Sequence, residues 1–175
     1  MKKLSILLLF LGLAIFVQAQ KENRLSGYFS AGANIMAYDR FIEFTHAGAG
    51  AGLQLHYSIN PKLKAQFDAA VSLFSINKII FVFENGQTAG PKQFVFTSFA
   101  GLVYSPVKRT EAGISAGPSF VEDGVYAGIK PYIGYYFGKK EKVKAQASLT
   151  HIFEKNSISK RNTGFVSFGL AVKLF

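Results

Sequence analysis

Apolar and polar residues alternate with a period of two along most of the chain. The clearest case runs from Ala47 to Ile59, where Ala, Leu, Tyr and Ile alternate with Gly, Gln, His and Ser. Asn60-Pro61-Lys62 is a tight turn signal, and the alternation resumes from Leu63 to Leu73. Because successive side chains of a strand point to opposite faces, the pattern predicts a long β-hairpin.

Further segments of similar length have the β-branched, aromatic and small residues that suit strands. They are Arg24 to Met36, Gln93 to Tyr104, Thr110 to Val121, Val125 to Phe137, Lys142 to Ile152 and Gly164 to Phe175. All but Gln93 to Tyr104 have one apolar face and one small or polar face. Strands of soluble proteins are mostly about 5–6 residues long, whereas membrane-spanning strands need about 9–11. Eight long strands therefore favour a membrane-spanning barrel.

The connections between these segments alternate in length. Short polar turns at 60–62, 105–109 and 138–141 alternate with longer segments at 37–46, 75–92 and 153–163, while 122–124 is short on the long-loop side. Outer-membrane barrels have short periplasmic turns and longer extracellular loops, so both chain ends are expected on the periplasmic side. Pro118 and Pro131 lie inside two segments, and because proline is confined to edges and bulges, we interpret both as bulges.

Composition narrows the class of protein. Only 17% of the 175 residues are charged, against about 25% in a typical soluble domain. The chain has no cysteine, which excludes a disulfide scaffold, cysteine-ligated metal, a cysteine nucleophile and a cysteine-linked lipid anchor. The formal net charge of +10 suggests nucleic acid as a partner only if the protein stays inside the cell.

The first residues predict export. Two lysines precede an apolar run from Leu4 to Val17, and Val17-Gln18-Ala19 offers small residues for a signal peptidase. This is the pattern of a secretory signal peptide over residues 1–19, with cleavage near Ala19/Gln20 and a mature domain over 20–175. A buried helix or a short membrane anchor is the alternative. Export argues against nucleic acid, and since no later apolar run reaches about 18 residues, only a closed β-barrel would span a membrane.

The two faces of the strands distinguish a membrane barrel from a soluble one. A lipocalin-like barrel, which remains an alternative, has apolar residues inside around a ligand. Here the polar set is small and mixed, which suits the narrow bore of eight strands. Tyr57, Tyr104, Tyr135 and Phe137 lie near the turn-side strand ends, where an interfacial girdle belongs. We predict an all-β, antiparallel up-and-down transmembrane β-barrel of about eight strands.

The polar set predicts a network of side chains in the lumen. Its members are Gln54, His56, Lys64, Gln66, Asp68, Glu111, Lys130, Tyr132, Lys144, Gln146 and Lys173. Buried charges must be paired or hydrated, and Glu111 is placed to meet bases from other strands. Because eight strands leave space only for side chains, we expect a hydrogen-bonded plug, with a small gated pore as the alternative and no cofactor.

The sequence resembles the small, roughly eight-stranded bacterial outer-membrane β-barrel proteins. The resemblance covers the signal peptide, the mature chain and the closing segment Gly164 to Phe175. In that family, a last strand that ends in an aromatic residue implies recognition of that residue, here Phe175, by the barrel-assembly machinery. The chain departs from the family pattern in one respect. Its apolar register runs from Val166 to Leu174, which places Phe175 on the polar set.

The long loops and the short turns carry residues that we expect to contact a protein partner or membrane lipid. Asn85-Gly86 is a hairpin-turn signal, and Ile79 to Phe83 is a plausible arm whose exposed edge would pair with a protein partner. Alternatively, the flanking strands simply extend outward without a partner. Loop bases Lys155, Lys160 and Arg161 would contact outer-membrane lipid and lipopolysaccharide. Turn-side bases would contact inner-leaflet phosphates; they are Lys108, Arg109, Lys139, Lys140 and Lys142.

One fragment is a candidate catalytic site. His56-Tyr57-Ser58 is similar to the His-x-Ser of the outer-membrane lipid A deacylases, which would make His56 the base and Ser58 the nucleophile. The fragment lies beside a periplasmic turn, away from the outer leaflet, and has no clear carboxylate partner. No zinc or nucleotide motif appears in its required context. We therefore predict a non-enzymatic barrel with a structural or surface-interaction role, and keep a lipid-modifying enzyme as the alternative.

Overall fold

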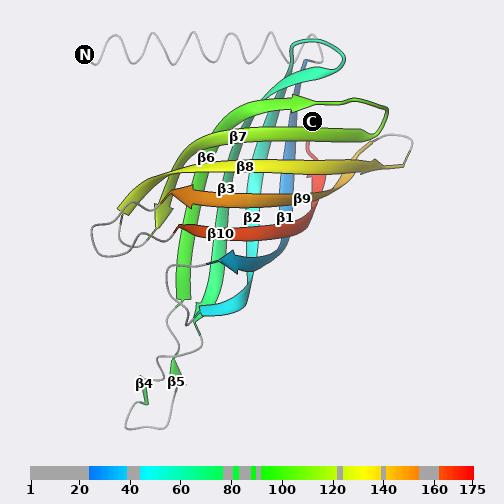
Figure 1. Cartoon of the computed structure of the whole chain (residues 1–175). Coiled ribbons are helices and arrows are strands. Elements are labelled where there is room, and N and C mark those ends of the chain that lie inside the picture. The colour runs from blue at the N-terminus through cyan, green and yellow to red at the C-terminus, as the bar shows by residue number, and fades with distance from the viewer. Residues whose placement is uncertain are drawn as a thin grey trace, which may run out of the picture.

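The structure, a computed structural model, is a closed antiparallel β-barrel (Figure 1). It describes residues 24–38, 44–76, 81–82, 88–89, 92–121, 124–138, 141–153 and 162–175. The strands within these ranges are β1 (Leu25–Tyr38), β2 (Phe44–Ser58), β3 (Leu63–Ile76), β4 (Phe81–Val82), β5 (Thr88–Ala89), β6 (Lys92–Tyr104), β7 (Thr110–Val121), β8 (Gly124–Phe137), β9 (Val143–Phe153) and β10 (Thr163–Lys173). None of the described ranges contains a helix long and apolar enough to cross a membrane.

Eight strands form the barrel, in the order β1-β10-β9-β8-β7-β6-β3-β2, and β4 and β5 form a separate two-stranded sheet. Every neighbouring pair is antiparallel, including the closing pair β1–β10, in which Tyr28 lies opposite Lys173. The predicted up-and-down barrel is therefore confirmed. The predicted strands differ from the observed ones by only a few residues at their ends, and β7 has the predicted bounds.

The turn between β2 and β3 shows how local sequence positions the strands. The Asn60 side-chain oxygen accepts hydrogen bonds from the backbone N–H groups of Lys62 (2.9 Å) and Leu63 (2.8 Å). This is the local bond that asparagine makes in tight turns. It brings the chain back in register, so that Ser58 lies opposite Lys64.

The interpretation of Pro118 and Pro131 as bulges is wrong. Both prolines pair in register between β7 and β8, Pro118 with Ala127 and Pro131 with Ile114. The ladders towards β6 and β9 are interrupted beside the prolines, but the same register resumes on the far side of each gap. A missing N–H removes a bond to one neighbour only, and it inserts no extra residue. The register shifts that do occur lie at the loop ends of β1 and β2.

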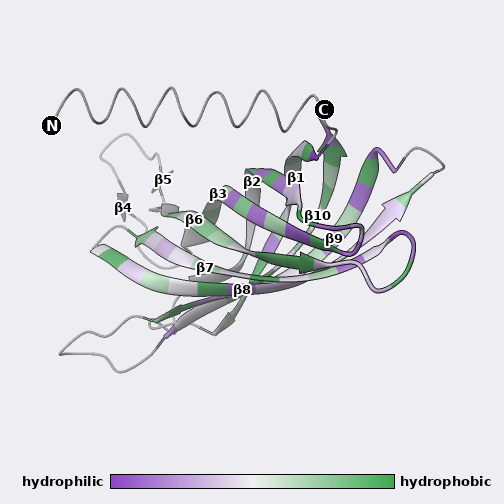
Figure 2. Ribbon diagram, turned by 90° about the horizontal axis from the view of Figure 1, so that it is seen from above, coloured by the Kyte–Doolittle hydropathy of each residue, from purple (hydrophilic) through white to green (hydrophobic). Residues whose placement is uncertain are grey.

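The two faces of most strands match the period-two pattern, which Figure 2 shows as alternating colours along strands such as β3. Large apolar side chains point outward around the barrel and are exposed, among them Leu53, Phe67, Ile114, Ile133 and Leu170. The inward set is mostly polar and buried. This is the reverse of a barrel that holds an apolar ligand, so the lipocalin-like alternative is contradicted.

Strand β6 received no face assignment from the sequence, and the structure supplies one. Phe94 and Leu102 are exposed, whereas Val95, Phe99 and Val103 are fully buried in the lumen. Both faces of β6 are therefore apolar, which is why periodicity alone did not separate them.

The short turns lie at one end of the barrel together with the C-terminus, and the β4–β5 sheet lies beyond the other end (Figure 1). The aromatic girdle residues Tyr57, Tyr104, Tyr135 and Phe137 are exposed near the turn end. The predicted signal peptide 1–19, its cleavage at Ala19/Gln20, and the loop bases Lys155, Lys160 and Arg161 lie outside the described residues.

Phe175 does not follow the polar register on which the sequence placed it. Strand β10 ends at Lys173, and the Leu174 N–H then donates to the Gly27 carbonyl at 2.8 Å. Gly27 belongs to the outward set of β1, and a Cβ on it would lie 2.6 Å from the Phe175 ring. The ring therefore covers Gly27 on the outside of the barrel, because the chain leaves the pleat after Lys173.

We predict that Gly101→Val destabilises the barrel by about 1–3 kcal/mol, the usual cost of overpacking. A Cβ at this inward position would meet the Ile114 carbonyl oxygen and the Ser115 side chain. The measurement is the urea dependence of the heat-modifiable gel mobility of the folded barrel. Ala100→Val, one residue away on the exposed face, is the control. Equal stability of the two variants would contradict the close packing at Gly101.

Candidate functional site

A cluster of charged and aromatic residues fills the turn-side half of the lumen. The Glu111 carboxylate lies 2.6 Å from the Lys144 ammonium through Oε1, and its Oε2 accepts a hydrogen bond from the Tyr136 hydroxyl at 2.6 Å. The Tyr132 hydroxyl donates to Oε1 at 3.3 Å, and Lys64 Nζ lies 3.6 Å from Oε2. Glu111 is therefore the acceptor at which strands β3, β7, β8 and β9 meet.

Lys144 extends this cluster across the bore. Its ammonium also donates to Gln54 Oε1 at 3.0 Å, and Gln54 Nε2 donates to Gln146 Oε1 at 3.0 Å. The ammonium lies 5.0 Å from the centre of the Tyr28 ring, within the range of a cation–π contact. Lys144 is fully buried, and these contacts satisfy a charge that is otherwise costly to bury.

A second ion pair lies nearer the middle of the barrel. Lys130 Nζ is 2.6 Å from Asp68 Oδ1, whereas Asp68 Oδ2 and both amide atoms of Gln66 are buried without a protein hydrogen-bond partner among the described residues. Lys64 and Asp68 share a face of β3, but each pairs with a residue from another strand. Strand register, which the sequence pattern does not contain, decides these pairings.

Most of the predicted lumen residues lie inside the barrel. Those buried are Gln54, His56, Gln66, Asp68, Glu111, Lys130, Tyr132 and Lys144. Lys64 and Gln146 are half-buried, and Lys173 is exposed. Lys173 lies at the last position of β10, so its side chain is at the mouth of the barrel rather than in the bore.

The sequence prediction omitted two tyrosines that belong to the cluster. Tyr28 and Tyr136 are buried, and their hydroxyls lie 3.5 Å apart. The strand pattern could have found Tyr28. It lies on the opposite face from Phe29 and on the same face as Asn34, which is also buried. Tyr136 was already on the polar face of its segment. Both tyrosines were left out because their rings are apolar, although their hydroxyl groups form hydrogen bonds in the lumen.

The candidate catalytic fragment does not assemble a nucleophile and a base. His56 is fully buried beside Tyr28, with the two ring centres 5.1 Å apart. Neither His56 nitrogen has a hydrogen-bond partner among the described residues, so the imidazole makes no hydrogen bond to the Ser58 hydroxyl. Ser58 lies at the turn end, where its N–H donates to the Arg24 carbonyl at 2.7 Å. The described residues also contain no cluster of side chains suited to a metal ion.

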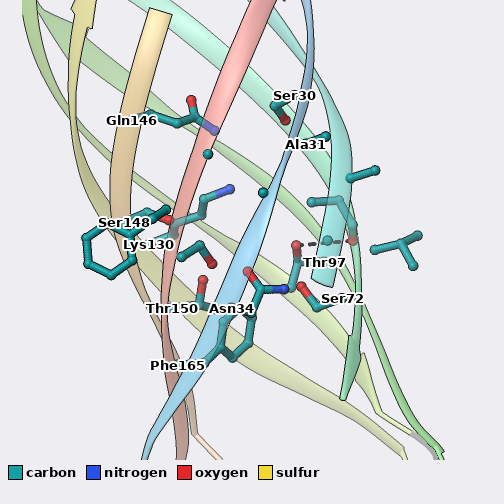
Figure 3. A pocket seen from close by; sticks show the side chains of 18 residues that line it. Ser30, Ala31, Asn34, Ser72, Thr97, Lys130, Gln146, Ser148, Thr150 and Phe165 are labelled. Carbon is teal, nitrogen blue, oxygen red and sulfur yellow. Dashed lines mark hydrogen bonds between the residues drawn. The ribbon is translucent and has the colours of Figure 1, made fainter. Parts of the chain in front are cut away.

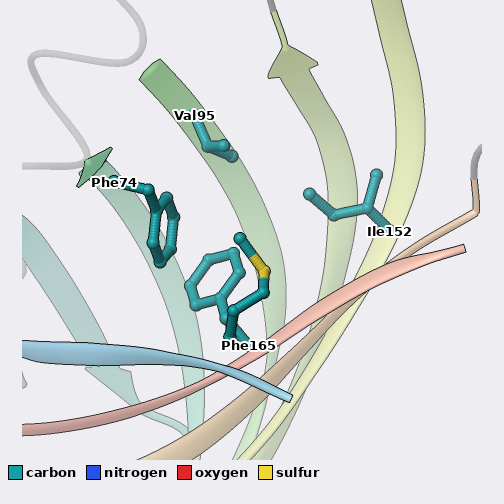
Figure 4. Close-up of a cluster of buried hydrophobic side chains, with 5 residues drawn as sticks. Phe74, Val95, Ile152 and Phe165 are labelled. Carbon is teal, nitrogen blue, oxygen red and sulfur yellow. The ribbon is translucent and has the colours of Figure 1, made fainter. Parts of the chain in front are cut away.

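The loop-side end of the lumen is closed by an apolar cluster, the apolar plug. It consists of Met36, Phe74, Val95, Ile152 and Phe165 (Figure 4). The Phe74 and Phe165 rings meet edge to face with their centres 5.1 Å apart. All five side chains come from the loop-side ends of their strands, so the plug lies at the loop-side end of the bore.

A polar cavity of about 50 Å³ lies between the plug and the charged cluster. Ser30, Asn34, Ser72, Thr97 and Lys130 are among the residues that line it (Figure 3). A cavity of this size has room for a few water molecules and is far smaller than the roughly 300–1,000 Å³ of pockets that hold small organic ligands. The lumen is thus a packed interior with a small polar void.

No model of a known protein family matches the sequence, and no curated protein matches it. Solved structures match its fold. The Yersinia pestis attachment invasion locus protein Ail is 12% identical, with a TM-score of 0.51 over 86% of this chain and 97% of that one. The structure of Ail with the heparin analogue sucrose octasulfate gives a TM-score of 0.53 over the same shares of the two chains, again at 12% identity. Neisserial surface protein A is 14% identical, with a TM-score of 0.53 over 86% of this chain and 97% of its own.

We predict that Lys144→Met destabilises the barrel by about 3–5 kcal/mol, because it leaves the buried Glu111 charge without its nearest partner. Lys64, at 3.6 Å, remains as a weaker partner and sets the lower end of this range. The double variant Lys144→Met/Glu111→Gln recovers most of the loss, since no fully buried charge is then left unpaired: Lys64 loses Glu111, but its side chain is 19% exposed. Urea unfolding in micelles measures both variants. A double variant no more stable than Lys144→Met would contradict the pairing.

The comparisons with Ail and Neisserial surface protein A identify a fold. At such low identity they extend no further than architecture: this chain has the closed eight-stranded barrel of the small outer-membrane proteins represented by Ail and Neisserial surface protein A.

Proposed function

We propose that this protein is a non-enzymatic integral protein of the bacterial outer membrane, which holds surface segments on a closed barrel. The outward band of apolar side chains carries this proposal. Residues such as Leu53, Ile114 and Ile133 are more than half exposed, and apolar surface on this scale marks contact with lipid or protein. The band runs around the whole barrel, as lipid requires, rather than over one patch.

The interior supports a structural role rather than transport or catalysis. Ion pairs, tyrosines and the apolar plug occupy the bore, and the void between them is about 50 Å³. We propose that the polar network of the lumen holds opposite strands together. The small gated pore and the lipid A deacylase-like enzyme are less well supported, because the bore is filled and His56 makes no hydrogen bond to Ser58.

The loop side supports the surface-interaction part of the proposal. Strands β4 and β5 pair with each other, Phe81 with Ala89 and Val82 with Thr88, and belong to no larger sheet. An unpaired strand edge is a template for another chain. We propose that a protein partner binds this hairpin by strand addition. Lipopolysaccharide is expected around the loop end, and the barrel-assembly machinery is expected to recognise Phe175.

We predict that Ile114→Arg destabilises the protein by about 2–4 kcal/mol and lowers its yield in the outer-membrane fraction, because the outward middle of β7 faces lipid. Ile59→Arg, in the turn after β2, is the matched control: the two side chains are 53% and 50% exposed, and only the first lies within the proposed hydrocarbon band. In water both substitutions would be neutral. Equal effects, or a wild-type protein in the aqueous fraction without a heat-modifiable gel shift, would overturn the membrane assignment.

The hairpin proposal predicts that a photo-cross-linking amino acid in place of Phe81 captures a single protein in intact cells. The same group in place of Val107, in a turn at the opposite end of the barrel, captures none of it. Mass spectrometry of the cross-linked product identifies the partner. Absence of any product at Phe81, or the same product from both positions, would remove the hairpin as a partner site.

A further inference from the structure

A basic pocket lies at the turn-side end of the barrel. It has a volume of about 350 Å³ and lies between the β2–β3 turn, the β6–β7 turn and Glu141, which precedes β9. Lys62, Lys64, Lys108 and Arg109 contribute four bases to its lining, and Glu141 contributes the only acid. The pocket therefore has an excess of positive charge at a mouth of the barrel.

Three of these bases are available to a ligand. Lys64 is already committed to Glu111 at 3.6 Å, but Lys62, Lys108 and Arg109 form no ion pair with any described residue. Like charges gathered in one pocket repel one another. An anion placed among them would relieve this repulsion.

The backbone holds the pocket in shape. The Ser105 N–H donates to the Lys62 carbonyl at 2.8 Å, which joins the two turns, and the Tyr136 N–H donates to the Arg109 carbonyl at 2.8 Å, which joins the second turn to β8. Within the turn, the Thr110 hydroxyl donates to the Val107 carbonyl at 3.2 Å. The bases are thus mounted on a fixed frame, which lowers the ordering cost of binding.

An apolar groove begins where the basic pocket ends. It has a volume of about 590 Å³, runs over the outward side of β7 to β10, and shares Pro106 and Thr110 with the pocket. Its outward lining includes the small residue Ala147, with Ile133 and Phe168 directly opposite it on the neighbouring strands. The row of small and large side chains leaves a furrow on the surface proposed to face lipid.

A cationic pocket continuous with an apolar furrow fits a molecule with an anionic head and a hydrocarbon tail. We propose that the basic pocket binds the phosphate of an anionic phospholipid while one acyl chain lies in the groove. Arg109 offers two parallel N–H donors to phosphate oxygens, and Lys62 and Lys108 add charge. This inference rests on the proposed membrane function, because it assigns the site to the leaflet at the turn side.

The test is native mass spectrometry of the folded barrel released from micelles that contain phosphatidylglycerol or phosphatidylcholine. The wild-type protein retains one phosphatidylglycerol in preference to phosphatidylcholine. Lys108→Gln/Arg109→Gln weakens phosphatidylglycerol binding by about tenfold or more, the size expected for lost charge-assisted hydrogen bonds. Arg24→Gln/Lys173→Gln removes two exposed charges outside the pocket and leaves binding unchanged. Equal losses in both double variants would show only diffuse charge attraction and overturn the proposal.

The groove is tested separately. Ala147→Leu fills it and weakens phosphatidylglycerol binding, whereas Ala49→Leu, an outward substitution on β2, does not. Inorganic phosphate competes only at far higher concentration than the lipid. Competition by phosphate at the same concentration would mean a phosphate site without a lipid tail. Because binding is measured on folded barrel in micelles, its absence there leaves the fractionation result, and with it the proposed function, unaffected.

Discussion

The closure of the strand ladder is the constraint on which the rest of the structure depends. Pairing of β1 with β10 leaves no open edge in the eight-stranded sheet. In an apolar solvent each unpaired backbone group costs several kcal/mol, so only a sheet closed on itself is stable there. Once the sheet is closed, the pleat leaves every second side chain outside and the others in the bore. A sequence with period two then specifies two separate environments.

The interior solves a problem that closure creates. Eight strands form a bore that is too narrow for a water-filled channel but wide enough to need side chains to fill it. Two groups of side chains fill most of it, the Glu111 cluster near the turns and an apolar plug that includes Phe74 at the loop side, and only a small polar void around Asn34 lies between them. Such a packed interior supports the two ends of the barrel, where the β4–β5 sheet and the basic pocket lie.

The sequence predicted the strands and their faces well because both depend on local alternation. It failed where the outcome depends on neighbours. We interpreted Pro118 and Pro131 as bulges because the sequence does not show which neighbouring strand lies beside each missing N–H. In the barrel, the ladder is interrupted towards one neighbouring strand only. The partners of Lys64 and Asp68 depend on register across the bore. The sequence named Lys108 and Arg109 as contacts for phosphates but did not join them to Lys62 in one pocket, because Lys62 and Arg109 are far apart in the chain and meet only where two turns are hydrogen-bonded.

The Glu111 cluster has a consequence for how one barrel is selected among the possible ones. A slip of one residue between two strands would turn the whole inward set of one strand towards lipid. For β9 it would expose the Lys144 ammonium to hydrocarbon and leave the Glu111 carboxylate alone in the bore, whereas the correct alignment joins side chains from four strands. A misaligned closure therefore has two energetic costs, one at Lys144 and one at Glu111. The cluster favours a single strand register, and so a single shear of the barrel.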